Sequence, residues 1–343
     1  MKFGIFDYID WRDEPLAKTF NDRMVLLRAA EKAGFYAYHV TEHHSTRLSS
    51  TPSPTVFLAA AARETTRIRL GALLFLLPLY NPLRLLEELC ILDNLSNGRL
   101  DIGVGRGISP HEFEVLDVDF EKSGTMFEEA LEVLVKGLSS DVLDHQGVHY
   151  QYKDIPMVWR PVQRPYPPLW YGLRTAEGHS RPARYGMNGV TLGPTDRVVS
   201  LLNGFREAWK EHAADPLRAG SPVKTPIEGV VRAMFIAPTD AEAEQIARPA
   251  YKQWFDSLAS LWIRRGTYPP ISLSADYDAA RKSGSLVVGS PETAKRELLA
   301  QAKATGINYL VLQLAFGSLG HANEMRSLEL FSREVKPALE ALG

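Results

Sequence analysis

The sequence predicts an α/β protein folded as a (β/α)8 TIM barrel with insertions, and three observations support this class. Short apolar segments alternate with amphipathic segments along all 343 residues. Strands that alternate with helices pair in parallel through crossover connections. Eight of the apolar segments have the length of a strand, and eight parallel β/α units close into one barrel.

The first four strands are expected at residues 2–6, 36–41, 68–77 and 100–104. Residues 68–77 are almost continuously apolar, which is typical of a strand that is buried on both faces. Helices are expected at residues 21–32 and 55–66, and again from Leu85 to Leu95, where leucine recurs at helical spacing. Gly34 and Gly98 mark the ends of the first and third helices.

The other four strands are expected at residues 169–173, 189–192, 229–237 and 309–314. Helical patterns cover residues 127–138, 176–185, 195–212 and 325–342. Two further helices are indicated by their N-terminal signals. Thr239 and Glu242 have the spacing of a capping box, and Ser290 precedes Pro291 as a capping residue precedes a first-turn proline.

Two segments interrupt this repeat and are expected to be insertions. Residues 142–168 combine a hairpin that turns at Gln146-Gly147 with a proline-rich loop from residue 156 onward. Residues 264–284 are polar and contain Pro269-Pro270, so we expect a long loop that closes over the site. No linker divides the chain, and residues 1–343 are therefore expected to form a single barrel domain.

Composition and charge argue against several functional classes. Lys and Arg total 39 against 41 Asp and Glu, and no basic tract stands out, so we expect no nucleic-acid partner. The longest apolar run, residues 71–79, is too short to cross a membrane, and Asp7 comes too early for a signal peptide. The single cysteine, Cys90, cannot form an internal disulfide, and we expect a cytoplasmic protein.

The active site of this fold lies at the carboxyl ends of the barrel strands, and Glu42-His43-His44 follows the second strand. His43 is the candidate for a catalytic or cofactor-contacting group, with a structural role and a metal site as alternatives. Two imidazoles and a carboxylate suit zinc or iron, but neighbouring residues of an extended segment point to opposite sides. Because no metal-binding spacing is present either, we expect no metal.

Two more groups of candidates follow the fourth and fifth strands. Residues 103–107 read Gly-Val-Gly-Arg-Gly, so the backbone and Arg106 bind an anion, or else the glycines form a tight turn of the barrel. Arg174, Thr175 and Ala176 stand where the fifth strand meets a predicted helix. Free N–H groups at a helix start bind phosphate, and ordinary capping by Thr175 is the alternative.

Several blocks of sequence, taken with these candidates, match one known family. They are Lys2-Phe3-Gly4 and residues 40–44, 77–78, 81–82, 92–107, 117–119, 288–292 and 335–337. The most specific is residues 92–107, Leu-Asp-Asn-Leu-Ser-Asn-Gly-Arg-Leu-Asp-Ile-Gly-Val-Gly-Arg-Gly. Over nearly its whole length the chain resembles the bacterial luciferase-like, flavin-dependent monooxygenases.

The resemblance implies an enzyme that uses reduced FMN, supplied by a separate flavin reductase, together with O2. A flavin C4a-peroxide would oxidise a small or medium organic substrate, with aldehydes and alkane-like compounds as candidates. The resemblance also implies a homodimer, with residues 82–96 and the preceding helix at its interface.

Individual residues carry over from the family. His43 would lie at the reactive edge of the flavin, and Arg106, Thr175 and Ala176 would hold its phosphate. A non-proline cis peptide bond would join Leu73 to Leu74 beneath the flavin ring.

The sequence departs from the family at three positions. Gly105 stands where the light-emitting subunit has a reactive cysteine, Gly124 where an arginine binds phosphate, and Arg174 where a glutamate lies near the phosphate. We therefore expect no light emission, and we expect Arg174 to contribute to cofactor binding. The alternatives are a non-catalytic flavin-binding partner subunit, a deazaflavin-dependent dehydrogenase of the same superfamily and a metal-dependent barrel hydrolase.

Overall fold

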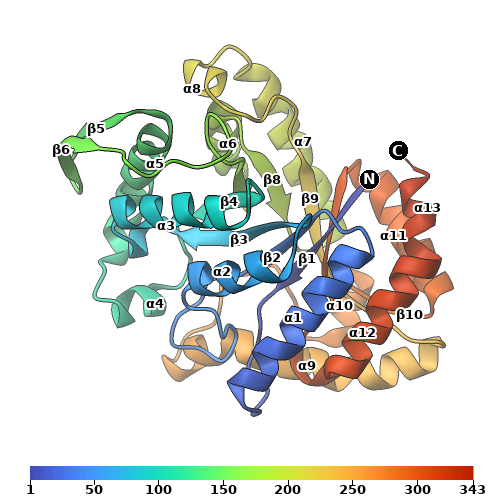
Figure 1. Cartoon of the computed structure of the whole chain (residues 1–343). Helices are drawn as coiled ribbons and strands as arrows, with labels where there is room; N and C mark the ends of the chain where they lie inside the picture. The colour runs from blue at the N-terminus through green and yellow to red at the C-terminus, as the bar shows by residue number, and fades with distance from the viewer. Residues whose placement is uncertain (343) are drawn as a thin grey trace.

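Eight parallel strands form a closed barrel in the computed structural model, which describes residues 1–342 apart from the side chain of Glu177 (Figure 1). The ring closes because β1 pairs with β11 and β8 pairs with β9. The predicted barrel and its eight strands are thereby confirmed. The strands are β1 (Lys2–Asp7), β2 (Ala37–Val40), β3 (Arg69–Leu76), β4 (Leu100–Gly105), β7 (Leu169–Gly172), β8 (Asn188–Thr191), β9 (Glu228–Ile236) and β11 (Tyr309–Gln313).

A ninth parallel strand, β10 (Leu286–Gly289), lies beside the barrel and was not expected. It pairs with the C-terminal half of β9, from Ala233 to Ile236, whereas β8 pairs only with the first residues of that strand. The long, mainly apolar strand β9 therefore pairs with β8 along its first residues and with β10 along its last residues. The segment 264–284 was expected to be a loop throughout, but it contains the short helix α10 (Tyr277–Lys282) that leads into β10.

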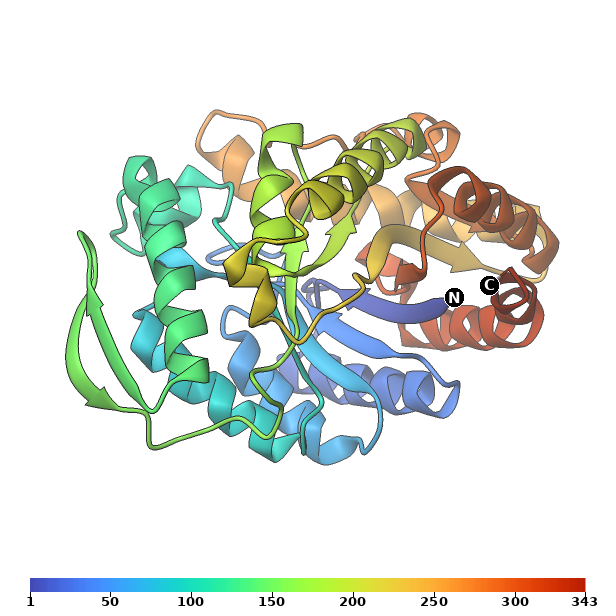
Figure 2. The same ribbon diagram turned by 90° about the horizontal axis from the view of Figure 1, so that it is seen from above.

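Helices surround the barrel, as the views from two directions show (Figures 1 and 2). Thr239 and Ser290 cap α9 and α11 through their side chains, as their sequence signals predicted. The longer helices are α1 (Leu16–Lys32), α2 (Pro54–Glu64), α3 (Pro82–Leu95), α5 (Ser123–Ser139), α7 (Thr195–Glu211), α9 (Asp240–Arg264), α11 (Pro291–Thr305) and α12 (His321–Leu330).

The remaining elements are short. They are α4 (Pro110–Val115), α6 (Ser180–Tyr185), α8 (Pro216–Ala219), α13 (Lys336–Glu340), a π-helical turn at Phe331–Val335, and 3-10 turns at Leu77–Leu79, Phe120–Lys122, Ala176–Gly178 and Gly317–Leu319. One continuous helix was expected at residues 176–185. The chain instead forms a 3-10 turn and then α6.

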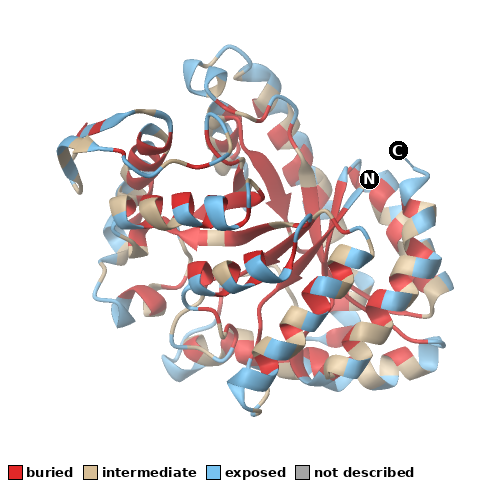
Figure 3. Cartoon of the chain, viewed as in Figure 1, coloured by how far each residue is buried: buried red, intermediate tan, exposed pale blue. Residues whose placement is uncertain are grey.

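The predicted hairpin is confirmed as the antiparallel pair β5 (Val142–Gln146) and β6 (Gln151–Pro156). It projects from the side of the barrel next to α5 in both views (Figures 1 and 2). The barrel strands are buried while the outer faces of the helices are exposed (Figure 3). No helix in the described part of the chain is long and apolar enough to span a bilayer.

Candidate active site

His43 lies just beyond the carboxyl end of β2, and its ring is held by a carboxylate from another loop. Its Nδ1 atom is 3.0 Å from Oε1 of Glu112, which belongs to α4 after strand β4. The same oxygen accepts the backbone N–H of His44 at 2.9 Å. Pro110 at the first position of α4 and Ser109 before it start this short helix, which brings Glu112 to the site.

The negative charge of Glu112 determines which nitrogen of a neutral His43 carries the hydrogen. Burial alone would raise the pKa of Glu112, but His43 and the His44 amide together lower it below its ordinary value. Glu112 is therefore ionised near neutral pH and can only accept hydrogen bonds. Nδ1 of a neutral His43 must then carry the hydrogen, which makes Nε2 the basic nitrogen available to a bound molecule.

The neighbouring histidine has a separate carboxylate partner. Nε2 of His44 is 2.9 Å from Glu42, which also accepts hydrogen bonds from the Tyr80 hydroxyl at 2.7 Å and from the Leu76 amide at 3.2 Å. Burial raises the pKa of Glu42 despite these contacts. His43 and His44 thus point to different carboxylates, and no cluster of metal-ligating residues occurs among the described side chains.

Aromatic rings form one wall beside His43. Its imidazole stacks on Tyr8, which follows β1, with ring centres 5.9 Å apart and an angle of 23°. Tyr8 in turn contacts Trp254 of α9 at 5.7 Å. Both aromatic side chains are buried, whereas 24% of the His43 side chain is exposed. His43 therefore has one open side and one packed side.

The Leu73–Leu74 bond is cis, at the position that the family resemblance implied. A side chain at Gly103 of β4 would collide first with the Ala72 backbone oxygen, 2.2 Å from where its Cβ would stand, and would crowd Leu74 at 3.0 Å, while one at Gly105 would collide with Leu74 at 2.6 Å. These two glycines therefore admit the Leu74 side chain. Gly107 has a φ of +85° and forms the turn after the strand, so close packing and a turn account for all three glycines.

Three arginines lie near one another after β4, after β7 and in the first turn of α7, and we call Arg106, Arg174 and Arg197 the arginine cluster. Arg197, from the first turn of α7, donates a hydrogen bond to the backbone oxygen of Arg174. Desolvation and the charges of Arg197 and Arg106 lower the pKa of Arg174. Among the described side chains, none of the three guanidinium groups pairs with a carboxylate. The cluster therefore offers uncompensated positive charge to an anion.

Thr175 and Ala176 stand beside the arginine cluster in the sequence. Thr175 precedes the 3-10 turn Ala176–Gly178, and its side chain does not cap that turn. The capping alternative for Thr175 is therefore wrong. The expected start of a full helix at Ala176 is also wrong, because the chain forms only a three-residue 3-10 turn there. So short a turn has little aligned dipole, and it would attract a phosphate only weakly.

Part of the segment between α9 and α10 lies across the barrel mouth. Thr267 contacts Nε2 of His111 at 2.7 Å, and the backbone oxygen of Pro270 accepts a hydrogen bond from Arg174 at 3.2 Å. Further along, the backbone oxygen of Ser274 accepts from the Tyr251 hydroxyl at 2.6 Å. These contacts join the loop to α4, to the end of β7 and to α9.

Sequence reasoning missed Glu112, Tyr8 and Arg197. Tyr8 had a usable signal, since it directly follows a barrel strand. Glu112 lies seven residues beyond the end of β4, and Arg197 belongs to α7. Both therefore lie outside the short segments that directly follow the barrel strands.

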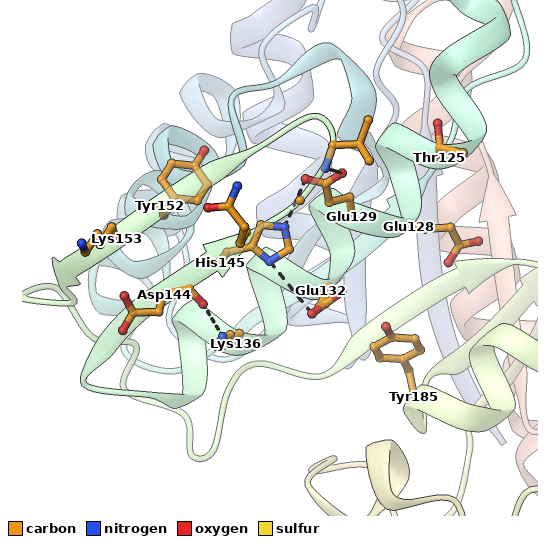
Figure 4. Close-up of a pocket in the computed structure, with 13 residues that line it drawn as sticks. Thr125, Glu128, Glu129, Glu132, Lys136, Asp144, His145, Tyr152, Lys153 and Tyr185 are labelled. Atoms are coloured by element: carbon orange, nitrogen blue, oxygen red, sulfur yellow. Dashed lines mark hydrogen bonds and ion pairs between the residues drawn. The ribbon is translucent and has the colours of Figure 1, made fainter.

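A more open hollow lies away from the barrel mouth, between α5 and the β5–β6 hairpin (Figure 4). It contains a second pair of histidine and glutamate, with Nε2 of His145 3.1 Å from Glu129. Most charged side chains around it are acidic, namely Glu128, Glu129, Glu132 and Asp144. We call this hollow the hairpin groove.

The chain matches the family model described as "Luciferase-like monooxygenase" over residues 1–309. It is 34% identical to the uncharacterized protein y4wF of Sinorhizobium fredii, over 93% of this chain and 92% of that one. It is 26% identical to the oxygenase component of the flavin-dependent trigonelline monooxygenase of Acinetobacter baylyi, over 79% of this chain and 76% of the relative.

Solved structures share the fold. Monooxygenase RslO1 from Streptomyces bottropensis has a TM-score of 0.87 and 25% identity, covering 99% of this chain and all of that one. The oxygenating constituent of 3,6-diketocamphane monooxygenase of Pseudomonas putida, in complex with FMN, has a TM-score of 0.82 and 22% identity, with 98% of both chains covered.

A coenzyme F420-dependent tetrahydromethanopterin reductase of Methanopyrus kandleri also has this fold, with a TM-score of 0.72, 17% identity and 98% of both chains covered. The fold alone therefore does not separate FMN from a deazaflavin. The family match over most of the chain, together with the closed barrel, does decide the enzyme class. The chain belongs to the luciferase-like monooxygenase family and is a flavin-dependent monooxygenase by class.

Proposed function

We propose that the protein uses reduced FMN and O2 to oxygenate a small or medium organic substrate. The observation that carries the proposal is the pairing of His43 with Glu112 at an aromatic wall, on the same barrel mouth as the arginine cluster. One region offers a positioned proton acceptor, and the other offers a site for a phosphate.

The described residues fit FMN at this mouth. The guanidinium groups of Arg106, Arg174 and Arg197 pair with no carboxylate among the side chains that the structure describes and suit a phosphate, with Thr175 and Ala176 beside them. Leu73 and Leu74 present an apolar surface for a flat ring. When bound and reduced, FMN supplies the electrons that activate O2.

The chain itself contributes proton handling and exclusion of water. His43 accepts or returns a proton at Nε2 while Glu112 holds its other nitrogen. Tyr8 and Trp254 cover one face of the imidazole and exclude water from that side. The second candidate is a deazaflavin-dependent dehydrogenase, because an F420-dependent reductase has the same fold.

The proposal extends to partners and setting. A separate flavin reductase supplies reduced FMN, as the oxygenase-component designation of the trigonelline relative supports. A homodimer is supported by exposed apolar side chains on α2 and α3, among them Val56 and Ile91, which are 72% and 50% exposed. The whole chain acts as one domain in the cytoplasm, where the single buried cysteine stays reduced.

One experiment tests the function. Photoreduced FMN is mixed with air and the protein, and O2 uptake, flavin absorbance and oxygenated products are followed with a panel of aldehydes, ketones and hydrocarbons. Oxygenated product that depends on reduced FMN is expected. Hydride exchange with a reduced deazaflavin, and no response to FMN, would support the dehydrogenase instead. Tight FMN binding without product from any compound would support a partner subunit.

A further inference from the structure

The C-terminal half of α9 contacts each of the three segments that surround His43. Trp254 contacts Tyr8, on which the His43 ring stacks. The hydroxyl of Thr46, three residues beyond His43, donates a hydrogen bond to a backbone oxygen of α9 at 3.3 Å. The third contact is to α4, the short helix that carries Glu112. One helix therefore touches the ring support, the loop and the carboxylate partner of His43.

The contact between α9 and α4 is made by His111, the residue before Glu112. Nε2 of His111 is 2.7 Å from the Thr267 hydroxyl, just beyond α9. That hydroxyl donates its single hydrogen to the Trp262 backbone oxygen at 3.2 Å, so it accepts from Nε2 of His111. The rings of His111 and Trp262 also meet edge to face, with centres 5.1 Å apart. A hydrogen bond and a ring contact therefore hold His111.

The helix α4 depends on such outside contacts for its position. It has six residues, and its N-cap residue Ser109 makes no hydrogen bond to it through the side chain. So short a helix has little stability of its own. Phe113 is fully buried against Phe120 and attaches α4 to the barrel. Arg265 contacts Glu114 at 3.2 Å, but both side chains are well exposed, and an exposed ion pair contributes little.

We propose that His111 is a positioning residue, which fastens α4 to the end of α9 and thereby holds Glu112 against His43. The inference rests on the proposed oxygenase function, in which His43 exchanges a proton at Nε2. Oε1 of Glu112 accepts from Nδ1 of His43 at 3.0 Å, and hydrogen bonds weaken steeply as their geometry worsens. When Glu112 moves away, a neutral His43 can carry its hydrogen on either nitrogen, and the molecules with Nε2–H lose the proton acceptor.

The first test uses the whole protein without flavin, so its outcome does not depend on turnover. In protein with isotope-labelled histidine, the NMR shifts of the two ring nitrogens report the His43 tautomer at about pH 8, where an ordinary imidazole is neutral. His43→Gln identifies the signals. His111→Ala should shift the tautomer ratio about tenfold towards Nε2–H, because the bond to a charged carboxylate is lost. Glu112→Ala should shift it in the same direction.

Thr267→Val tests the same contact from the exposed loop. It should also shift the His43 tautomers towards Nε2–H, and combining it with His111→Ala should add little, because the two residues share one contact. His111→Gln keeps a donor for the Thr267 hydroxyl and should stay close to the wild type.

His149→Ala is the matched control, because it removes another hydrogen bond from histidine Nε2 to a threonine hydroxyl, that of Thr125 at 2.8 Å. It should leave the His43 tautomer unchanged. An unchanged tautomer in both His111→Ala and Thr267→Val would overturn the proposal, and so would an equal shift in His149→Ala.

Turnover with reduced FMN separates this inference from the oxygenase function. His111→Ala should lower oxygenated product per reduced FMN about tenfold, with FMN affinity unchanged, and His111→Gln should retain most of the yield. An unchanged yield in His111→Ala would overturn the role of His111 in the reaction. A wild-type protein that forms no product would refute the oxygenase function, while the tautomer measurement would still report whether His111 positions Glu112.

Discussion

Two histidine–glutamate pairs of nearly equal length occur in different regions, and their surroundings differ. His43 and Glu112 are 3.0 Å apart at the barrel mouth, and His145 and Glu129 are 3.1 Å apart in the hairpin groove (Figure 4). Nε2 of His43 has no hydrogen-bond partner among the described residues, and the ring stacks on Tyr8. In contrast, the second nitrogen of His145 faces Glu132 at 3.9 Å, and only 5% of its side chain is exposed.

The glutamates of the two pairs also differ in what they bind. Glu129 accepts the backbone N–H groups of Val148, His149 and Tyr150, so it ties the hairpin turn to α5. Glu112 accepts one backbone N–H and orients one imidazole. The two pairs therefore differ at the second ring nitrogen, which faces another carboxylate in His145 and faces none among the described residues in His43.

Replacing the histidines gives the largest expected difference. His43→Gln should lower oxygenated product per reduced FMN at least about 100-fold, because glutamine can hydrogen-bond Glu112 but cannot exchange a proton at neutral pH. FMN affinity should stay within about twofold, since positive charge at the arginine cluster is retained. Product yield and FMN fluorescence quenching measure the two effects.

The matched variant is His145→Gln, which should leave product yield unchanged. Equal losses in the two variants would remove the functional distinction between the regions. An unchanged yield in His43→Gln would refute the role of His43 in proton handling.

The same two regions show how far the sequence could predict the molecule. The eight barrel strands and the hairpin followed from local patterns, such as the apolar run of β3 and the Gln146-Gly147 turn. Strand β10 (Leu286–Gly289) was missed because it is a ninth strand that pairs with the far end of β9, beyond the eight β/α units of the barrel. Its partner is set by the closed ring, which local periodicity does not encode.

The candidate site was predictable only in part. His43 could be proposed because it follows a strand directly, and the cis bond at Leu73–Leu74, which the resemblance implied, is present. Glu112 and Arg197 come from α4 and α7, and only the three-dimensional ring brings them to His43 and Arg174. The spacing of residues along the chain does not predict such contacts.

The two regions also carry opposite charge, and this difference leads to the second prediction. The arginine cluster is cationic, whereas the hairpin groove is mainly acidic. Arg174→Gln and Arg197→Gln should each weaken FMN binding about tenfold, because each removes a charge-assisted contact to phosphate. Salt should weaken FMN binding less in these variants than in the wild type.

Lys136→Gln in the groove is the control and should leave FMN affinity unchanged, since Lys136 contacts the Asp144 backbone rather than the mouth. Riboflavin, which lacks the phosphate, should bind the wild type and the arginine variants alike. A loss of riboflavin affinity in the arginine variants would show that they disturb the ring site and not a phosphate site.

A smaller effect is expected on stability when the groove carboxylate is changed. Glu129→Gln should lower the free energy of unfolding by about 1–3 kcal/mol, because three backbone N–H groups lose a charged acceptor. Activity per folded molecule should not change. Urea unfolding at neutral pH measures the loss, and Glu132→Gln, at a side chain that is 63% exposed, should have little effect. A loss of activity in correctly folded Glu129→Gln would link the hairpin to catalysis.

The smallest expected effect is the pH dependence of that difference. Burial raises the pKa of Glu129, but the hairpin N–H groups and His145 together lower it below the ordinary value of about 4.3. The folded state therefore binds this proton more weakly than the unfolded state does. The stability that the charge contributes is complete above about pH 4.3 and is lost as pH falls through the lower folded pKa.

The gap between wild type and Glu129→Gln should accordingly be constant near neutral pH and shrink in acid, as followed by urea unfolding from about pH 7 to about pH 3.5. Asp10, whose pKa burial raises to about 6, titrates in the opposite sense. It is present in both proteins, so its contribution cancels in the difference. A gap that stays constant into acid would mean that the shape of the Glu129 side chain, and not its charge, anchors the hairpin.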